Sequence, residues 1–146
     1  MKAFKTIFTA LLLAFVFGTV SAQAADKTPL TPEFCEEGIT KAVEVFNDMV
    51  VKINEIEKTE QVQEIPQILN SIKYRNVRKK YGKIELTDEY RARLLEPNLR
   101  IGQALKDMMV RLQLPYELQK MLDEQASPEK IKQAIDESKT LREVME

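Results

Sequence analysis

Apolar residues in the first third of the chain after residue 30 recur with the spacing of an α-helix. They alternate at intervals of four and three residues, which places them on one side of a helix. The positions are Cys35, Ile39, Ala42, Phe46, Met49, Ile53 and Ile56. Thr31 and Pro32 suit the start of this helix, because threonine caps free backbone N–H groups and proline fits the first turn. We predict a helix from Pro32 to about Lys58, with Phe46 and Ile53 in the core.

The same spacing continues after Thr59, which is a suitable cap for a second helix. Its apolar positions are Val62, Ile65, Leu69 and Ile72. Pro66 falls in or just after the first turn, where a proline is tolerated but can bend the helix. We expect this helix to continue to Tyr81 and to end at Gly82, since glycine commonly follows a helix C-terminus.

Three further helix starts are visible in the second half of the chain. Thr87 precedes two acidic residues and opens a third helix, which Pro97 is expected to kink or break. Pro115 ends the apolar pattern and starts a short helix. Ser127-Pro128 then repeats the cap-plus-proline signal and opens the last helix, whose apolar side includes Ile131 and extends to Met145.

Composition agrees with these periodic patterns. Glycine is scarce, with 4 residues in 146, and long straight-chain residues that favour helices dominate. We therefore predict an all-α fold, an antiparallel helical bundle of four main helices, with proline breaks near Pro66, Pro97 and Pro115.

The N-terminus is typical of a cleavable secretory signal peptide. Lys2 and Lys5 precede an apolar run at 11–17, and small residues occupy both recognition positions of a cleavage site that ends at Ala24. The run is too short to span a bilayer. We expect cleavage after Ala24, a single helical-bundle domain at 25–146, and, since the short signal is bacterial in style, a periplasmic destination.

The charge balance argues against a dedicated nucleic-acid binder. The chain has 22 basic and 23 acidic residues, and removal of residues 1–24 leaves 20 and 23. Nucleic-acid binders are usually strongly basic. One stretch departs from the even mix, namely Arg75, Arg78, Lys79, Lys80 and Lys83 between and beyond Tyr74 and Tyr81. It suits an anionic partner, with the tyrosines adding contact area; alternatively, it is a solvated helix end that complements the helix dipole.

The usual catalytic and metal-binding patterns are missing. The chain has no histidine and one cysteine, so a thiol–imidazole pair and a zinc site are excluded. Acidic residues that are adjacent on a helix diverge and form no acid–base pair. Cys35 can be a core residue, an intermolecular disulfide partner or a reactive thiol. The methionines fit core packing better than a copper site. We expect no enzyme and no cofactor, although catalysis by carboxylates alone stays open.

Two stretches are similar to the cytochrome b562 family. Asn47-Asp48, Ile53 and the run 55–62 resemble that family's first helical hairpin, and the run 139–142 resembles its closing helix. The resemblance implies a bundle of the same architecture. That family binds haem between an early methionine and a late histidine, and Glu146 lies near where the late ligand would be. The resemblance therefore implies a relative that does not bind haem through histidine.

These observations favour an exported, non-enzymatic binding protein that acts through a helical surface. Its partner would be a protein or an anionic component of the cell envelope, with membrane contact that is at most peripheral. A carrier of a small ligand or cofactor in the bundle interior is the alternative. The oligomeric state is open.

Overall fold

The computed structural model describes residues 30–146 of the chain. The expected signal peptide and its cleavage site lie outside these residues. The described part is all-α, as predicted, and none of its helices is long and apolar enough to cross a membrane. In order, the elements are α2 (Pro32–Asn54), the 3-10 helix η1 (Thr59–Glu64), α3 (Ile65–Leu69), α4 (Ile72–Tyr81), α5 (Asp88–Arg111), α6 (Tyr116–Gln125), α7 (Pro128–Glu137) and α8 (Leu141–Met145).

The helix starts follow from local capping. Thr31, Thr87 and Ser127 precede α2, α5 and α7, and each side-chain oxygen accepts a hydrogen bond from the N–H three residues on. Helix α2 ends at Asn54, four residues before the predicted end. Phe46 and Ile53 are fully buried, which confirms the centre of the predicted seam.

The predicted second helix is divided into three elements. A 3-10 turn precedes α3, so the break near Pro66 is present, with the proline in the first turn of α3. A second, unexpected break falls at Asn70, whose backbone leaves the helical region. Ser71 then caps α4 through a hydrogen bond from the N–H of Tyr74 to its hydroxyl oxygen, 3.1 Å long. The cap offers the backbone an alternative to a continuous helix, and this is why α3 and α4 are separate helices.

Pro97 does not break α5, contrary to the prediction. The helix runs without interruption from Asp88 to Arg111, and Pro97 is buried within it. Proline removes one backbone donor and crowds the preceding turn. Packing of α5 against α2 on one side and α6 and α7 on the other holds the helix together in spite of this cost. The break at Pro115 is confirmed, since Pro115 occupies the cap position of α6.

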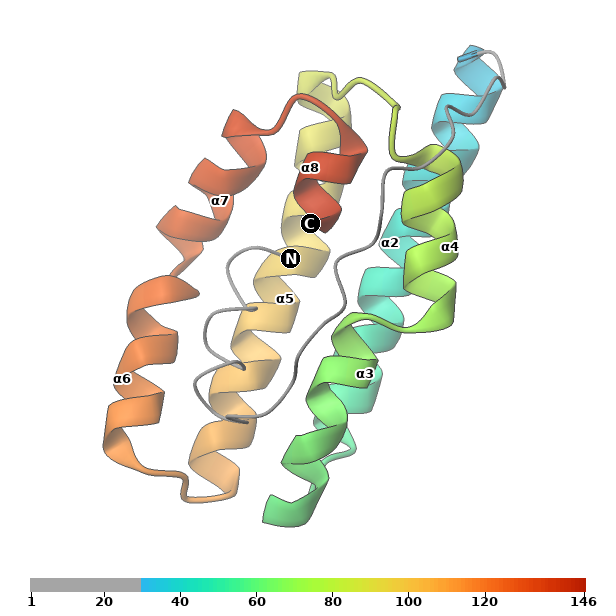
Figure 1. The fold of residues 1–146 in the computed structure, drawn as a ribbon. Helices are drawn as coiled ribbons and strands as arrows, with labels where there is room; N and C mark the ends of the chain where they lie inside the picture. Colours follow the sequence, from blue (N-terminus) through green and yellow to red (C-terminus); the bar gives the residue numbers. More distant parts are fainter. Residues whose placement is uncertain (1–29) are drawn as a thin grey trace.

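The last predicted helix also divides. Helix α7 ends at Glu137, and Ser138 is extended before α8 begins at Leu141. The intervening backbone pairs with the segment that precedes α5: Leu86 N–H donates to Lys139 O and Leu141 N–H to Ile84 O, each at 2.9 Å. These bonds fix α8 against the end of α4 (Figure 1).

The most extensive helix contact joins two parallel helices, α2 and α5. Near their N-terminal ends Arg93 pairs with Glu36, and near their C-terminal ends Arg111 donates to the carbonyl oxygen of Ile56 at 2.8 Å. The contacts therefore advance in the same direction along both helices. A bundle in which all neighbours are antiparallel does not have this pairing.

The return helices flank that central pair. Helix α4 runs back along α2, because Lys73 pairs with Asp48 at one end and Tyr81 lies beside Gly38 at the other. Helices α6 and α7 run back along α5, where Lys106 faces Asp123. Figure 1 shows α4 and the α6–α7 pair on opposite sides of α5. The all-α class is therefore as predicted, whereas a bundle of four antiparallel helices is not confirmed; α4 lies at the margin with one face open to solvent.

Candidate α4 basic surface

The predicted cationic residues gather on one helix and the residue beyond it. Four of them belong to α4 and Lys83 follows its end. We call the set Arg75, Arg78, Lys79, Lys80 and Lys83 the α4 basic surface. Arg75, Lys79 and Lys80 are exposed, whereas Arg78 and Lys83 are half-buried. No acidic residue occurs in α4. The surface is therefore a local concentration of positive charge on a chain with near-even overall charge.

The two tyrosines of this stretch do not belong to the surface. Tyr74 and Tyr81 retain only 1% and 4% of their exposure, so the prediction that they add contact area is wrong. With Val77 they recur at the helical spacing that faces α2 and α8, and their rings pack on Phe46 and Phe34. The stretch is an amphipathic helix whose aromatic residues belong to the core.

Two of the cations interact with these buried rings. The guanidinium carbon of Arg78 lies 5.7 Å from the ring centre of Tyr74, and Lys80 Nζ lies 5.1 Å from that of Tyr81. Such contacts stabilise a cation against an aromatic face. Arg78 and Lys80 thus have a structural role in addition to their charge.

Arg75 and Lys79 differ from Lys73 on the same helix and from the arginines of α5. Within residues 30–146 their side chains form no hydrogen bond or ion pair, whereas Lys73, on the same helix, pairs with Asp48. On α5, every arginine has a protein partner; these are Arg91, Arg93, Arg100 and Arg111. Lys79 lies in the last turn of α4, where the helix dipole favours a cation. Arg75 lies a turn earlier, so the dipole does not explain its position.

An exposed isoleucine completes this face and was missed by the sequence pattern. Ile72 was predicted to continue the apolar seam, but its side chain is 69% exposed. The break at Asn70 restarts the helix in a new register, which turns Ile72 outward. Arg75, Asn76 and Lys79 follow at i+3, i+4 and i+7 and share its side of α4. If Ser71 had been recognised as a helix cap in the sequence, the helical spacing would have been counted afresh from Ile72, and Ile72 would not have been assigned to the preceding apolar seam.

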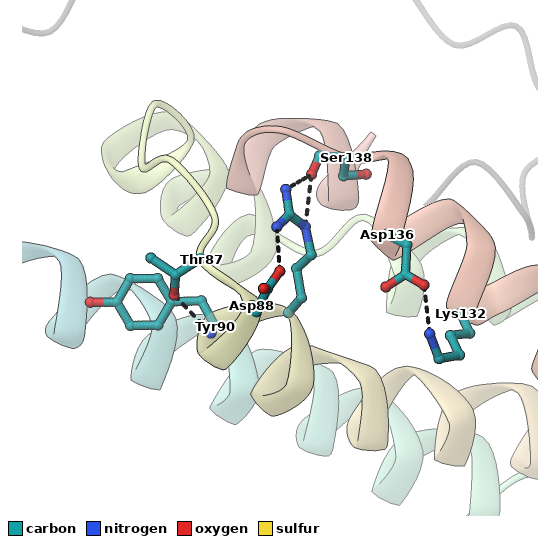
Figure 2. Close-up of polar contacts among 7 residues, drawn as sticks. Thr87, Asp88, Tyr90, Lys132, Asp136 and Ser138 are labelled. Atoms are coloured by element: carbon teal, nitrogen blue, oxygen red, sulfur yellow. Dashed lines mark hydrogen bonds and ion pairs between the residues drawn. The ribbon is translucent and has the colours of Figure 1, made fainter.

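Another polar cluster links α5 to the end of α7. Figure 2 shows an ion pair of Asp88 and a guanidinium that also reaches the backbone oxygen of Ser138. The guanidinium is that of Arg91, which lies 3.2 Å from Asp88 Oδ1 and donates to Ser138 O at 2.9 Å and 3.3 Å. The nearby Lys132–Asp136 pair is exposed and within one helix. These contacts satisfy the carbonyl at the end of α7 and include no proton acceptor placed beside a nucleophile.

The cysteine and most of the methionines, the other candidate groups, pack in or against the hydrophobic core. Cys35 is a free thiol, half-buried against the core. Most of the methionines are buried, namely Met49, Met108, Met109 and Met145. No group of three or more histidine, cysteine or acidic residues that would hold a metal occurs among residues 30–146.

One buried polar group has an unmet hydrogen bond. Asn98 is 1% exposed on the inner side of α5. Its side-chain N–H group donates to Leu94 O at 2.7 Å, but its oxygen, Oδ1, has no partner in the described part of the chain. A buried acceptor without a donor is uncommon and destabilising unless something else supplies the donor.

In comparisons with known proteins, no family model, no curated protein and no solved structure matches this chain.

Proposed function

We propose that this chain is an exported, non-enzymatic binding protein that contacts an anionic partner through the α4 basic surface. The observation that carries the proposal is the state of Arg75 and Lys79: both are exposed on a helix without acidic residues, and neither side chain has a protein partner within residues 30–146. Local positive potential of this kind attracts negatively charged surfaces and accelerates association.

The arrangement of the fold supports a surface role for α4. The helix is anchored on its inner side by Tyr74, Val77 and Tyr81, all buried. Its charged side can therefore engage a partner without any change in the core. Since the cations are exposed, their attraction should weaken over the Debye length, about 10 Å at 0.1 M salt.

A matched pair of double variants tests the proposal. Arg75→Gln with Lys79→Gln removes two charges from the α4 basic surface. Lys120→Gln with Lys130→Gln removes two charges from exposed positions of α6 and α7 that likewise have no ion pair within the described part of the chain. The probe is labelled inorganic polyphosphate, and its affinity is measured by fluorescence anisotropy at low and moderate salt.

We expect the α4 variant to bind polyphosphate roughly tenfold more weakly at low salt, and the control variant to bind it with almost unchanged affinity. The affinity of the α4 variant should also depend less on salt, because its binding releases fewer counterions. Equal affinity of the wild type and both variants at every salt concentration would contradict the proposal. The α4 cations would then be only solvated charges that complement the helix dipole.

Export is a separate part of the proposal, supported by the pattern of residues 1–24. Expression of the full chain in a bacterium, followed by intact-mass measurement of the periplasmic fraction, should give a chain that starts at Ala25. Recovery of soluble protein that retains residues 1–24 would contradict it.

Asn98 supports the alternative function, a carrier for a small ligand in the interior. Its Oδ1, which has no donor within residues 30–146, would be satisfied by a ligand that donates a hydrogen bond inside an apolar core. Native mass spectrometry and an absorption spectrum of protein purified from the periplasm test this. A small molecule at stoichiometric level, lost in Asn98→Leu but retained in Arg75→Gln, would favour the carrier over the surface-binding function.

A further inference from the structure

An exposed apolar side chain lies among the cations of α4. Ile72 is 69% exposed, and Arg75 and Lys79 share its side of the helix. The helix restarts at Ser71, and Ile72, its first residue, is not among the buried residues of α4. A large aliphatic side chain that is exposed next to cations can enter the interface of an anionic membrane while the cations contact its headgroups.

We propose that the anionic partner of the α4 basic surface is a lipid surface with phosphate headgroups, on which the protein binds peripherally and Ile72 enters the headgroup layer. The inference rests on the proposed function and names its partner. Cations near an anionic bilayer each add to the attraction, and an apolar side chain adds burial that a charged protein surface does not offer.

The surroundings of Ile72 favour a lipid surface over an acidic protein. Asp48, the acidic residue of α2 that reaches α4, is paired with Lys73 at 3.0 Å and so adds no net charge there. The Ile72 side of α4 thus combines cations on long flexible side chains with one outward aliphatic group, and these can adapt to a laterally fluid lipid surface.

The cations that would contact the lipid surface lie at different positions along α4. Arg75 and Lys79 lie about one and two helical turns beyond Ile72, since an α-helix rises about 1.5 Å per residue. A flat anionic surface can contact all three side chains together. Arg78, stacked on Tyr74, holds its charge at the side of this row.

The test uses the mature chain and vesicles of phosphatidylcholine with and without phosphatidylglycerol. Ile72→Ser removes the apolar group, and Val110→Ser is the matched control, because Val110 is 66% exposed on α5. Binding is measured by co-sedimentation at low salt, and circular dichroism checks that both variants are folded. Both positions are exposed, so neither change should unfold the chain.

The expected result is binding of the wild type to anionic but not to neutral vesicles, roughly tenfold weaker binding of Ile72→Ser, and unchanged binding of Val110→Ser. Equal vesicle binding of Ile72→Ser and the wild type would overturn the inference, since charge alone would then explain the affinity.

A second outcome separates this inference from the function on which it rests. If the wild type binds polyphosphate through Arg75 and Lys79 but does not sediment with anionic vesicles, the lipid inference is wrong and the proposed anionic partner stands. If it binds neither probe, both are wrong.

Discussion

The hydroxyl of Tyr74 on α4 donates a hydrogen bond to the backbone oxygen of Met145, at the end of α8. This bond joins residues that are 71 positions apart, and both side chains are buried. It therefore ties the C-terminal helix to the inner side of the helix that carries the basic surface. The position of α4 therefore depends on how α8 packs against it. The same packing determines where Ile72, Arg75 and Lys79 lie.

Replacement of Tyr74 by Phe should destabilise the fold. It leaves the oxygen of Met145 buried without its donor, a loss of about 1–3 kcal/mol in the free energy of unfolding. Urea denaturation measures the change, and Tyr116→Phe, at an exposed tyrosine, is the control. A loss as small as that of the control would show that water or another donor replaces the phenol.

Tyr74 should also make stability depend on pH in the alkaline range. Burial raises the pKa of Tyr74 well above its ordinary value of 10.0; nearby Arg78 acts in the opposite direction and Glu146 in the same one. The unfolded chain then loses this proton at a lower pH than the folded chain. The contribution is complete below pH 10 and falls as the pH rises above it.

The measurement is urea unfolding from pH 8 to pH 11 for the wild type and Tyr74→Phe, with the difference between them taken at each pH. A tenfold difference in proton affinity between the folded and the unfolded chain corresponds to about 1.4 kcal/mol, which sets the scale of the effect. The advantage of the wild type should shrink above pH 10. A constant difference over this range would mean that Tyr74 titrates normally.

Truncation of the central seam should be costly. Phe46→Ala or Ile53→Ala removes a fully buried side chain from α2 and should reduce the free energy of unfolding by roughly 2–5 kcal/mol. Thermal unfolding measures this, with Val110→Ala as the exposed control. Losses under about 0.5 kcal/mol would be typical of a surface site and would place the seam outside the core.

Gly38 should not tolerate alanine, although alanine is the better helix former. A Cβ at this position would lie 2.7 Å from Tyr81 Cδ1 and still nearer to Ile84. Overpacking of this kind costs about 1–3 kcal/mol. Thermal unfolding of Gly38→Ala against Glu37→Ala, at its exposed neighbour, tests this close packing. Equal melting temperatures would show that Ile84 and Tyr81 move aside freely.

Replacement of Asn98, unlike that of the other buried residues above, should not destabilise the fold. Asn98→Leu removes an acceptor that has no donor within residues 30–146 and replaces it with an apolar group of similar size. The free energy of unfolding of the ligand-free chain should stay the same or rise by about 1 kcal/mol. A marked decrease in chemical denaturation would reveal that Oδ1 is satisfied in solution, by water or by a ligand.

Several features of this protein could be read from the sequence because their causes are local. The caps at Thr31, Thr87 and Ser127 join a side chain to an N–H three residues away, so they need no tertiary contact. The burial of Phe46 and Ile53 follows from a period that one helix imposes on its own side chains. The five cations of the candidate surface are visible for the same reason, since they lie close together along one short stretch of chain.

Other features were decided by the tertiary structure. A proline inside a helix has a known local cost, but only the packing of α5 on both sides determines that the helix passes through Pro97 unbroken. The parallel contact of α2 and α5 joins segments more than 50 residues apart, and no local pattern specifies which helices become neighbours. The orientation of Tyr74 inward and Ile72 outward depends on where Ser71 restarts the helix and on what α2 and α8 bury against it. Local signals place charges and caps along the chain, whereas the choice of which side chains a partner can reach belongs to packing between distant segments.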